Sequence, residues 1–481
     1  MGTKGMTAGR GTTEINDRVG TAGWSPKRQE PRPEMSRFQG DRLARRKLIK
    51  LAASVAATGP LLLLPRGAPA GTRTLRIAKW THFVFEFDEW FTNYAADWGL
   101  RNATRVVIDS FPVEKIAAVA AAQIRADDGH DIFMFPWPPA QYYQHTIDHT
   151  EIYRAVAGKY GSIPQLAYRS TLHPRNGKHF AFADFWLPCP LHFFQDQWLK
   201  VGMPFGPLTY DSLRSGGKTL REKHGIPSGL AFTATLEGNV TLHTLLYAFR
   251  AWVLGANGSV LFNGNAFAVE ALKYIRALYQ ESGTPAQLGW EPRGNVRAML
   301  ARRTSCTANA ISLLRVAEKQ DTGLAGRIWL QPPLIGTNGM GITALPHITN
   351  CSAIWRFARN QDAARQFLAD LVDSSRLGYE KSLGCNFPIY PKTVPDLVVR
   401  LSNDSHADPP GKYLELKDSL HWTPNLGVPG FATPEYMEIF NTSLVPRMVQ
   451  SVLKGERSPQ DAAAVGAAEM QRIVAKWQQQ T

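Results

Sequence analysis

Aromatic rings stand beside hydrogen-bonding side chains at several places in this 481-residue chain, close to the ends of predicted strands. An aromatic face packs well against C–H groups, while amide, carboxylate, imidazole and hydroxyl tips pair with hydroxyls. This combination suits a ligand with an apolar face and hydroxyl edges, such as a sugar. The candidate ligand-binding residues are Trp80, His82, Phe83, Trp137, Asp184, Trp186, Thr233, Asn309, Trp422 and Asn425.

These candidates also have structural interpretations. Trp80 ends a predicted buried strand, where packing in the core explains it as well as ligand contact does. Asp131 follows Gly129 at the head of a strand and is better explained as a turn cap. His82 and His421 could suggest a metal, but no trio of carboxylates accompanies them. We therefore expect neither a metal nor a cofactor.

The candidate loops need a scaffold that brings them together. The sequence predicts a strand over 75–80, a helix over 83–99, a strand over 105–109, a helix over 113–126 and a strand over 129–135. This alternation predicts a parallel α/β layer. In such a layer, ligands gather at the loops that follow the carboxyl ends of the strands.

Helical spacing of apolar residues dominates the rest of the chain. The further predicted elements are an extended segment over 178–182, helices over 197–201, 210–224, 240–253 and 266–282, a strand over 327–333, and helices over 361–374 and 459–477.

The N-terminal region resembles an export signal. Residues 1–40 lack apolar periodicity and are predicted to be a disordered extension. Residues 41–70 hold the adjacent pair Arg45 and Arg46, then a 14-residue apolar segment, then a small-residue cleavage pattern. A membrane anchor is the alternative, but a span needs about 20 apolar residues. We expect a twin-arginine-like signal and a mature chain in the periplasm or outside the cell.

Charge and cysteine content restrict the possible functions further. The formal net charge is +14, but residues 1–70 alone hold 13 Lys and Arg residues against 5 Asp and Glu. No basic run follows them, so nucleic-acid binding is not expected. The cysteines, at 189, 306, 351 and 385, lack metal-site spacing. Buried free thiols are the simplest interpretation, and one disulfide of undefined pairing is the alternative.

Enzyme signatures are missing from the sequence. It holds neither a Gly-x-Ser-x-Gly turn nor a glycine-rich phosphate loop. Glu86, Asp88 and Glu89 cluster, but at a predicted helix start, where the helix dipole favours carboxylates. A binding protein is therefore favoured over an enzyme, although carboxylates distant in sequence could still pair for glycoside hydrolysis.

Five segments, in this order, resemble family 1 of the extracellular solute-binding proteins, which includes maltose-binding protein. The segments are the strand and helix from residue 75, the strand entry at 128–133, the crossing strand at 177–182, the helix start at 207–213, and residues 297–310. The resemblance implies a two-lobed α/β fold of the type II periplasmic binding protein kind, with discontinuous lobes joined by hinge strands. We expect one lobe at 72–182 plus 334–374 and the other at 183–333 plus 375–481.

The same resemblance implies a function. A carbohydrate ligand would lie in the cleft between the lobes, and the chain, a monomer, would deliver it to the membrane permease subunits of an ABC importer. Hinge bending closes such clefts, and periplasmic binding proteins are the standard example. The alternatives are the same fold with a polyamine, compatible solute or peptide, a sensory protein that docks on a membrane receptor, or a secreted carbohydrate-active enzyme.

Overall fold

The computed structural model describes residues 73–336 and 343–480. The predicted extension at 1–40 and the predicted signal at 41–70 lie outside these residues. Within the described ranges, every helix is too short or too polar to cross a lipid bilayer.

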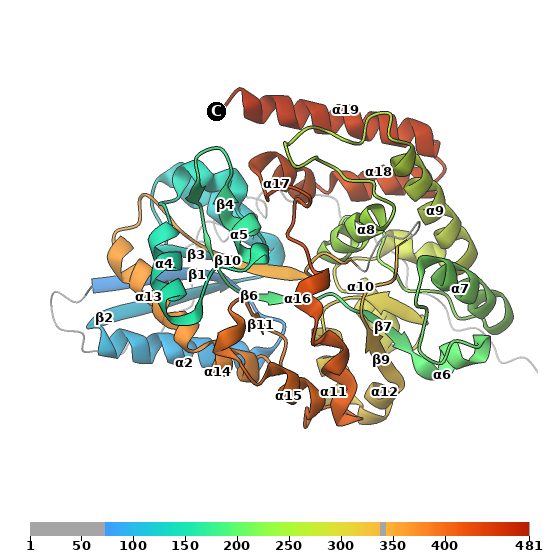
Figure 1. Cartoon of the computed structure of the whole chain (residues 1–481), viewed down its shortest axis with the longest axis horizontal. Helices are drawn as coiled ribbons and strands as arrows, with labels where there is room; N and C mark the ends of the chain where they lie inside the picture. The colour runs from blue at the N-terminus through green and yellow to red at the C-terminus, as the bar shows by residue number, and fades with distance from the viewer. Residues whose placement is uncertain (1–72, 337–342, 481) are drawn as a thin grey trace, which may run out of the picture. The chain divides into compact units, whose positions relative to one another are not determined.

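The larger of the two main sheets is six-stranded and mixed (Figure 1). Strands β1 (Arg73–Trp80), β2 (Thr104–Phe111) and β3 (Ile132–Phe135) run parallel, so the predicted parallel layer is confirmed. The order of the sheet is β11-β6-β10-β3-β1-β2. All four residues of β3 are buried, as expected for a central strand that is covered on both faces.

The other three strands of this sheet are antiparallel to their neighbours. Strand β10 (Ile348–Ile354) pairs with β3 on one side and with β6 (Phe182–Leu187) on the other. Strand β11 (Phe387–Pro388) pairs with β6 at the edge. Segments more than 160 residues apart in the sequence therefore meet in one sheet.

Helix α2 (Phe85–Arg101) covers this sheet with an aromatic stripe. Its buried residues recur three and four positions apart, which places them on one face. Its Trp98 ring meets Phe367 of α13 (Gln361–Asp373) at 5.1 Å, and the Trp98 indole donates to Asp370 at 2.9 Å. These side-chain contacts join α2 to α13.

The second main sheet is smaller and antiparallel. Strand β7 (Leu191–Phe194) lies between β8 (Cys306–Ala308) and β9 (Ile328–Gln331). Helices α7 (Tyr210–His224) and α9 (Ala266–Ser282) pack against each other and match their predicted bounds.

Helix α8 (Leu236–Ala248) corrects one prediction, because it begins and ends earlier than the predicted 240–253. Thr235 caps its start by accepting from the Gly238 amide. Beyond its end, Arg250 has a φ of 60°. That left-handed conformation turns the chain out of the helix.

Three C-terminal helices, α17 (Pro434–Asn441), α18 (Leu444–Leu453) and α19 (Pro459–Gln478), pack together (Figure 1). Helices α18 and α19 contact α9, whereas α17 contacts η3 (Ala140–His145), which follows β3. A separate ion pair of 2.8 Å joins Glu435 of α17 to Arg175, which lies between β4 (Leu172–His173) and β5 (Lys178–His179). The C-terminal helices thus pack against elements associated with both sheets.

The remaining elements connect or cover the two sheets. They are η2 (Val113–Lys115), α3 (Ile116–Ala126), α4 (Thr150–Tyr160), α5 (Gln165–Thr171), β4 (Leu172–His173), β5 (Lys178–His179), α6 (Gln195–Trp198), η4 (Leu199–Val201), η5 (Pro285–Gly289), α10 (Gly294–Leu300), α11 (Ser312–Gln320), α12 (Thr322–Arg327), α14 (Ser375–Lys381), η7 (Pro391–Thr393), α15 (Leu397–Ser402), η8 (Pro410–Leu416) and α16 (Ser419–Trp422).

We call the six-stranded sheet with its helices the first lobe, and the three-stranded sheet with its helices the second lobe. The chain passes from the first sheet to the second between Leu187 and Leu191. Because β6 and β11 pair within the first sheet, we propose lobe boundaries that differ from the predicted ones, with 183–187 and 375–388 in the first lobe.

The structure supports two structural interpretations made from the sequence, that of Asp131 as a cap and that of the cysteines as buried free thiols. The Asp131 carboxylate accepts from the backbone amides of Arg76, Arg359 and Asn360 at 2.8, 2.8 and 3.1 Å, so it is a cap. The four cysteines are free and buried, as the simplest interpretation held. Burial raises the pKa of the Cys189 thiol to about 12, which keeps it uncharged.

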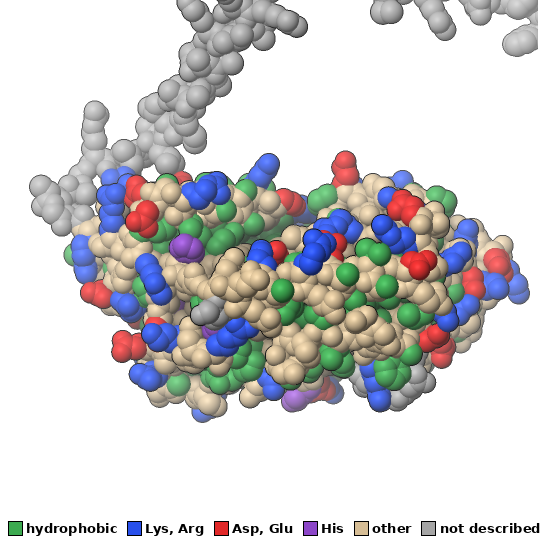
Figure 2. All heavy atoms as spheres, turned by 90° about the horizontal axis from the view of Figure 1, so that it is seen from above, with side chains coloured by type: hydrophobic (Ala, Val, Ile, Leu, Met, Phe, Trp, Pro, Cys, Tyr) green, Lys and Arg blue, Asp and Glu red, His purple; other side chains and the backbone are tan. Residues whose placement is uncertain are grey.

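Charged side chains of both signs are interspersed on the face of the molecule shown in Figure 2. A surface of this kind lacks the continuous basic stripe that tracks a phosphate backbone.

Candidate ligand-binding site

Two cavities of about 270 and 310 Å³ lie between the lobes and share Phe83, Glu237 and Arg293 as lining residues. We call them together the interlobe cleft, the first being the aromatic end and the second the arginine end. Both lobes supply their walls. A volume of this size suits a small ligand.

Loops at one edge of the first sheet supply one wall. Phe83 follows β1, Glu114 follows β2, and Trp137 follows β3. These three strands are parallel, so their carboxyl ends meet at one edge. Phe83 and Trp137, two of the predicted residues, therefore lie in the same cleft.

The start of α8 supplies the opposite wall with Glu237 and Asn239. Gly238 between them makes a close backbone approach, since a Cβ at this position would lie 1.9 Å from the Thr233 carbonyl oxygen. Only glycine fits such a turn without displacement of the chain. Thr233 itself is buried one residue before Ala234, which lines the cleft.

Arg293 links the two walls. Its φ is 61°, and its backbone amide donates to a Glu237 carboxylate oxygen at 3.2 Å. The guanidinium lies 5.5 Å from the centroid of the Phe83 ring. Such a cation–π contact across the cleft contributes about 0.5–1 kcal/mol at an exposed site.

Three buried polar atoms at the cleft have no hydrogen-bond partner among the described residues. They are the amide nitrogen Nδ2 of Asn309, the amide oxygen Oδ1 of Asn239 and the ring nitrogen Nδ1 of His347. Burial lowers the pKa of His347 to about 4, so its ring is neutral near pH 7. Each unpartnered buried group lowers stability by about 1–3 kcal/mol unless something pairs with it, and a polar ligand could do so.

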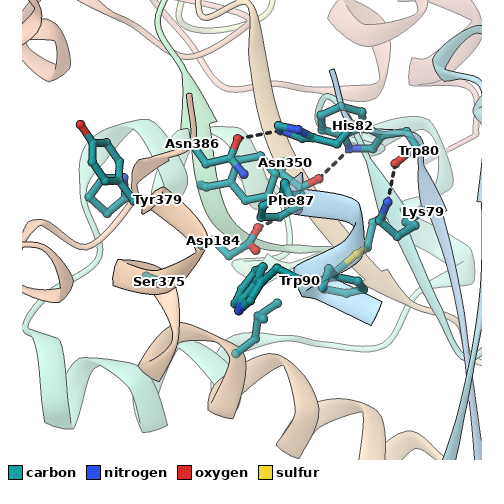
Figure 3. Close-up of a pocket in the computed structure, with 16 residues that line it drawn as sticks. Lys79, Trp80, His82, Phe87, Trp90, Asp184, Asn350, Ser375, Tyr379 and Asn386 are labelled. Atoms are coloured by element: carbon teal, nitrogen blue, oxygen red, sulfur yellow. Dashed lines mark hydrogen bonds between the residues drawn. The ribbon is translucent and has the colours of Figure 1, made fainter. Parts of the chain in front are cut away.

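Three other predicted residues, Trp80, His82 and Asp184, line a different cavity (Figure 3). It lies inside the first lobe and has a volume of about 30 Å³, room for about one water. The Trp80 indole donates to Asn350 at 2.8 Å, and Asn350 donates to Asp184 at 2.8 Å. These side chains already have partners within the chain and do not line the interlobe cleft.

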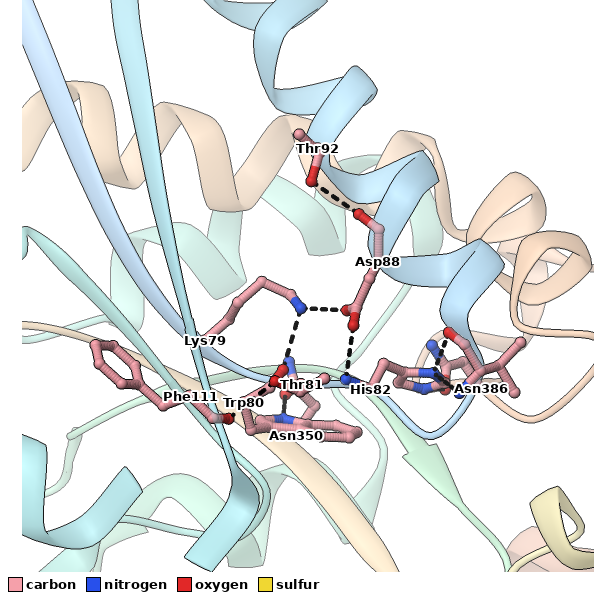
Figure 4. A network of polar contacts seen from close by, with 10 residues as sticks. Lys79, Trp80, Thr81, His82, Asp88, Thr92, Phe111, Asn350 and Asn386 are labelled. Atoms are coloured by element: carbon pink, nitrogen blue, oxygen red, sulfur yellow. Dashed lines mark hydrogen bonds and ion pairs between the residues drawn. The ribbon is translucent and has the colours of Figure 1, made fainter. Parts of the chain in front are cut away.

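A polar network beside this inner cavity explains Asp88, one of the three acidic residues at the start of α2 (Figure 4). Asp88 pairs with the buried Lys79 ammonium and accepts from the His82 backbone amide at 3.0 Å. The His82 ring is hydrogen-bonded to Asn386 at 2.9 Å. Burial lowers the pKa of Lys79, and Asp88 opposes that shift. Asp88 therefore stabilises the fold.

The last three predicted residues are buried away from the cleft. Trp186 packs against Phe387 with ring centroids 5.6 Å apart. The Asn425 amide nitrogen donates to the carbonyl oxygens of Leu426 and Gly430, which closes a loop. Trp422 is buried at the end of α16.

Of the residues predicted from sequence, Phe83, Trp137 and Asn309 line the interlobe cleft. Glu237, Arg293 and Asn239 line it as well but were not predicted. Thr235 has the residue type of a helix N-cap. Recognising it would have moved the predicted start of this helix from 240 to 236, next to Glu237 and Asn239. Arg293 precedes a short helix and has no spacing signal that could have found it.

The described ranges hold no cluster of three or more His, Cys, Asp or Glu side chains suited to a metal ion.

Solved structures share the fold at low sequence identity. Maltose-bound MalE3 of T. maritima superposes with a TM-score of 0.68 at 17% identity, covering 83% of this chain and 99% of that one. A sugar transporter from Arthrobacter chlorophenolicus with bound laminaribiose gives a TM-score of 0.69 at 13% identity, with 83% and 99% covered. A solute-binding protein from Agrobacterium radiobacter in complex with ribitol gives 0.65 at 18%, with 83% and 98% covered.

No family model matches this chain, and no curated protein matches it in sequence. The structural likeness shows the fold. The chain has the two-lobed α/β architecture of the periplasmic solute-binding proteins, which confirms the predicted fold class.

Proposed function

We propose that this chain is a receptor that binds a carbohydrate between its lobes. The observation that carries the proposal is the composition of the interlobe cleft. Phe83 and Trp137 line it from the first lobe, and Asn309, whose amide nitrogen has no partner among the described residues, lines it from the second. Rings suit the C–H face of a sugar, and amides suit its hydroxyls.

The proposal extends to transport. The neighbours of known structure include ABC transporter solute-binding proteins bound to tagatose and ribitol. We propose that this chain is exported through its twin-arginine-like signal, acts as a monomer without a cofactor, and delivers its ligand to ABC permease subunits. Closing of the lobes over a ligand would create the surface that a permease recognises.

Ligand binding is testable by thermal unfolding. We expect at least one saccharide or polyol in a panel to raise the melting temperature by about 3 °C at 100 times its Kd, because a ligand stabilises the folded state by mass action. Polyamines, compatible solutes and short peptides belong in the same panel. If only polyamines, compatible solutes or peptides raise the melting temperature, the ligand is one of these and not a carbohydrate. If no compound raises it, the receptor proposal is refuted.

Two variants test the location of the site. Trp137→Ala and Phe83→Ala are expected to weaken binding about 10- to 100-fold, since each removes a ring that packs on the ligand. Phe205→Ala is the matched control, because Phe205 is 73% exposed and does not line the cleft. Equal losses in all three variants would contradict this location.

One observation favours a second candidate function. Glu114 and Glu237, one from each lobe, line the aromatic end of the cleft. Glycoside hydrolases use two facing carboxylates. If the chain is such an enzyme, incubation with oligosaccharides releases new reducing ends, and Glu237→Gln abolishes the release. We expect binding without any product.

A further inference from the structure

We infer that the bound saccharide is acidic, with its anionic group held by Arg293 and Arg297 at the arginine end of the cleft. This inference rests on the proposed function and adds the chemical class of the ligand. It comes from four features of the cleft: its unpaired cations, its hydrogen-bond donors, its acidic opposite end and its aromatic wall.

The two arginines lie one helical turn apart at the start of α10, and both side chains line the same cavity of about 310 Å³. Within the described residues, neither guanidinium forms an ion pair with Asp or Glu, whereas Arg302 nearby pairs with Asp196 at 2.8 Å. Arg297 donates to the Pro292 carbonyl at 2.9 Å. Most of the donors of this pair stay available to a ligand.

Other donors surround the same cavity. Asn309 is 3% exposed, and its Oδ1 accepts from the Ala310 amide at 2.8 Å, which leaves the Nδ2 group without a partner. The Ser312 hydroxyl and the neutral His347 ring, each able to donate one hydrogen bond, also line the cavity. The two guanidinium groups and the Asn309 amide nitrogen only donate, so they match a group that only accepts, and a carboxylate is such a group.

The aromatic end of the cleft has the opposite net charge, because Glu114 and Glu237 line it with Arg293 as the one cation among the described lining residues. Trp137 and Phe440 also line it, with their rings 6.0 Å apart. Carboxylates accept from sugar hydroxyls and repel an anion. The cleft thus distinguishes its two ends, which orients a ligand with hydroxyls at one end and an acid at the other.

The geometry of arginine fits this task. A guanidinium binds a carboxylate with two parallel hydrogen bonds, which selects for a planar anion over a neutral hydroxymethyl group. The Phe83 ring under Arg293, at 5.5 Å, limits where that guanidinium can lie. Glu237, the one carboxylate that also lines the arginine end, accepts from the Arg293 backbone amide rather than from its side chain.

Calorimetric titration of the full chain with matched sugars tests the inference. Glucuronate and galacturonate, as monomers and short oligomers, are compared with glucose, galactose and their neutral oligomers. We expect an acidic member to bind at least about tenfold more tightly than its neutral counterpart. Raising the salt concentration from 0.05 to 0.5 M should weaken the acidic ligand and leave a neutral one unchanged.

Variants then assign the preference to residues. Arg293→Gln and Arg297→Gln should each reduce the preference for the acid about tenfold, while the control Arg303→Gln leaves it unchanged. Arg303 is exposed after α10 and outside the cleft, so it removes the same charge elsewhere. If either cleft variant fails to fold, the wild-type comparison of acidic and neutral sugars still decides.

The outcomes separate this inference from the proposed function. Neutral sugars that bind as well as or better than their acids overturn the inference and leave the receptor proposal intact. Failure of every saccharide, acidic or neutral, refutes both. An acid preference that persists in both cleft variants refutes the assignment to Arg293 and Arg297.

Discussion

Acidification from pH 6.5 to about 4.5 is expected to unfold this chain, because six buried histidines must take up protons. These six are His82, His149, His179, His192, His243 and His347. Burial lowers the pKa of His192 to about 3 and that of each of the others to about 4. In the unfolded chain all six bind protons near pH 6.5.

His149 shows the physical reason. Its Nε2 accepts from the Ile354 backbone amide at 3.0 Å, and its Nδ1 lies 3.2 Å from the His179 carbonyl oxygen. The first contact fixes the tautomer, with the proton on Nδ1. Protonation of Nε2 would place a second donor against that amide and a charge in a buried site.

The sign of the effect follows from proton binding. Between pH 6.5 and 4 the unfolded state holds more protons on these histidines, so stability is complete above pH 6.5 and is lost as the pH falls. Asp184 acts in the opposite direction, since burial raises its pKa to about 7 and the folded state holds its proton throughout this range. The net uptake on unfolding is about four protons near pH 5.5, or about 5 kcal/mol per pH unit.

Urea unfolding at half-unit steps between pH 7 and 5 measures this slope. Asp184→Asn is the matched control, because an amide removes the opposing titration and can still accept from Asn350. The unfolding free energy of the variant should depend on pH more steeply, by about one proton, and the variant should be more stable than the wild type above pH 7. A wild-type slope that corresponds to the uptake of one proton or less would contradict the explanation by buried histidines.

The sequence predicted the scaffold well because its signals are local. The aromatic residues of α2 recur at helical spacing, and β3 is an uninterrupted apolar run. Helices α7 and α9 end at glycines 225 and 283, which the pattern marks clearly. Such features depend on neighbours in the chain, so one sequence suffices to find them.

The site was less predictable because it depends on contacts between distant segments. Trp80 ends β1 and Phe83 lies three residues later in the loop that follows, yet the Trp80 side chain bonds to Asn350 in the core and Phe83 lines the cleft. Nothing local distinguishes the two rings. Arg293 belongs to the site only because the second lobe places it over Phe83, more than 200 residues away in the sequence.

Replacing Arg315 by Met is expected to destabilise the chain by about 3–5 kcal/mol. This arginine of α11 has a side chain that is 3% exposed, and it pairs with Glu318 at 2.8 Å and with both oxygens of Asp404. Its guanidinium also lies 4.1 Å from the centroid of the Tyr413 ring. Methionine fills a similar volume but leaves two carboxylates in a buried site without a cation.

The loss arises from the carboxylates that remain rather than from the ion pairs that disappear. Tyr413 donates to Glu318 at 2.9 Å and the His406 backbone amide donates to Asp404 at 2.9 Å. Each carboxylate therefore keeps one hydrogen-bond partner but loses its cation. A triple variant, Arg315→Met with Glu318→Gln and Asp404→Asn, should therefore recover much of the lost stability. Urea unfolding at pH 7 measures the single and triple variants. Arg359→Met is the exposed control, because the Arg359 side chain is 75% exposed in its ion pair with Asp128, and we expect a loss below about 1 kcal/mol. Equal losses in the single and triple variants would show that packing around Arg315, rather than its charge, joins α11 to the segment that carries Asp404 and Tyr413.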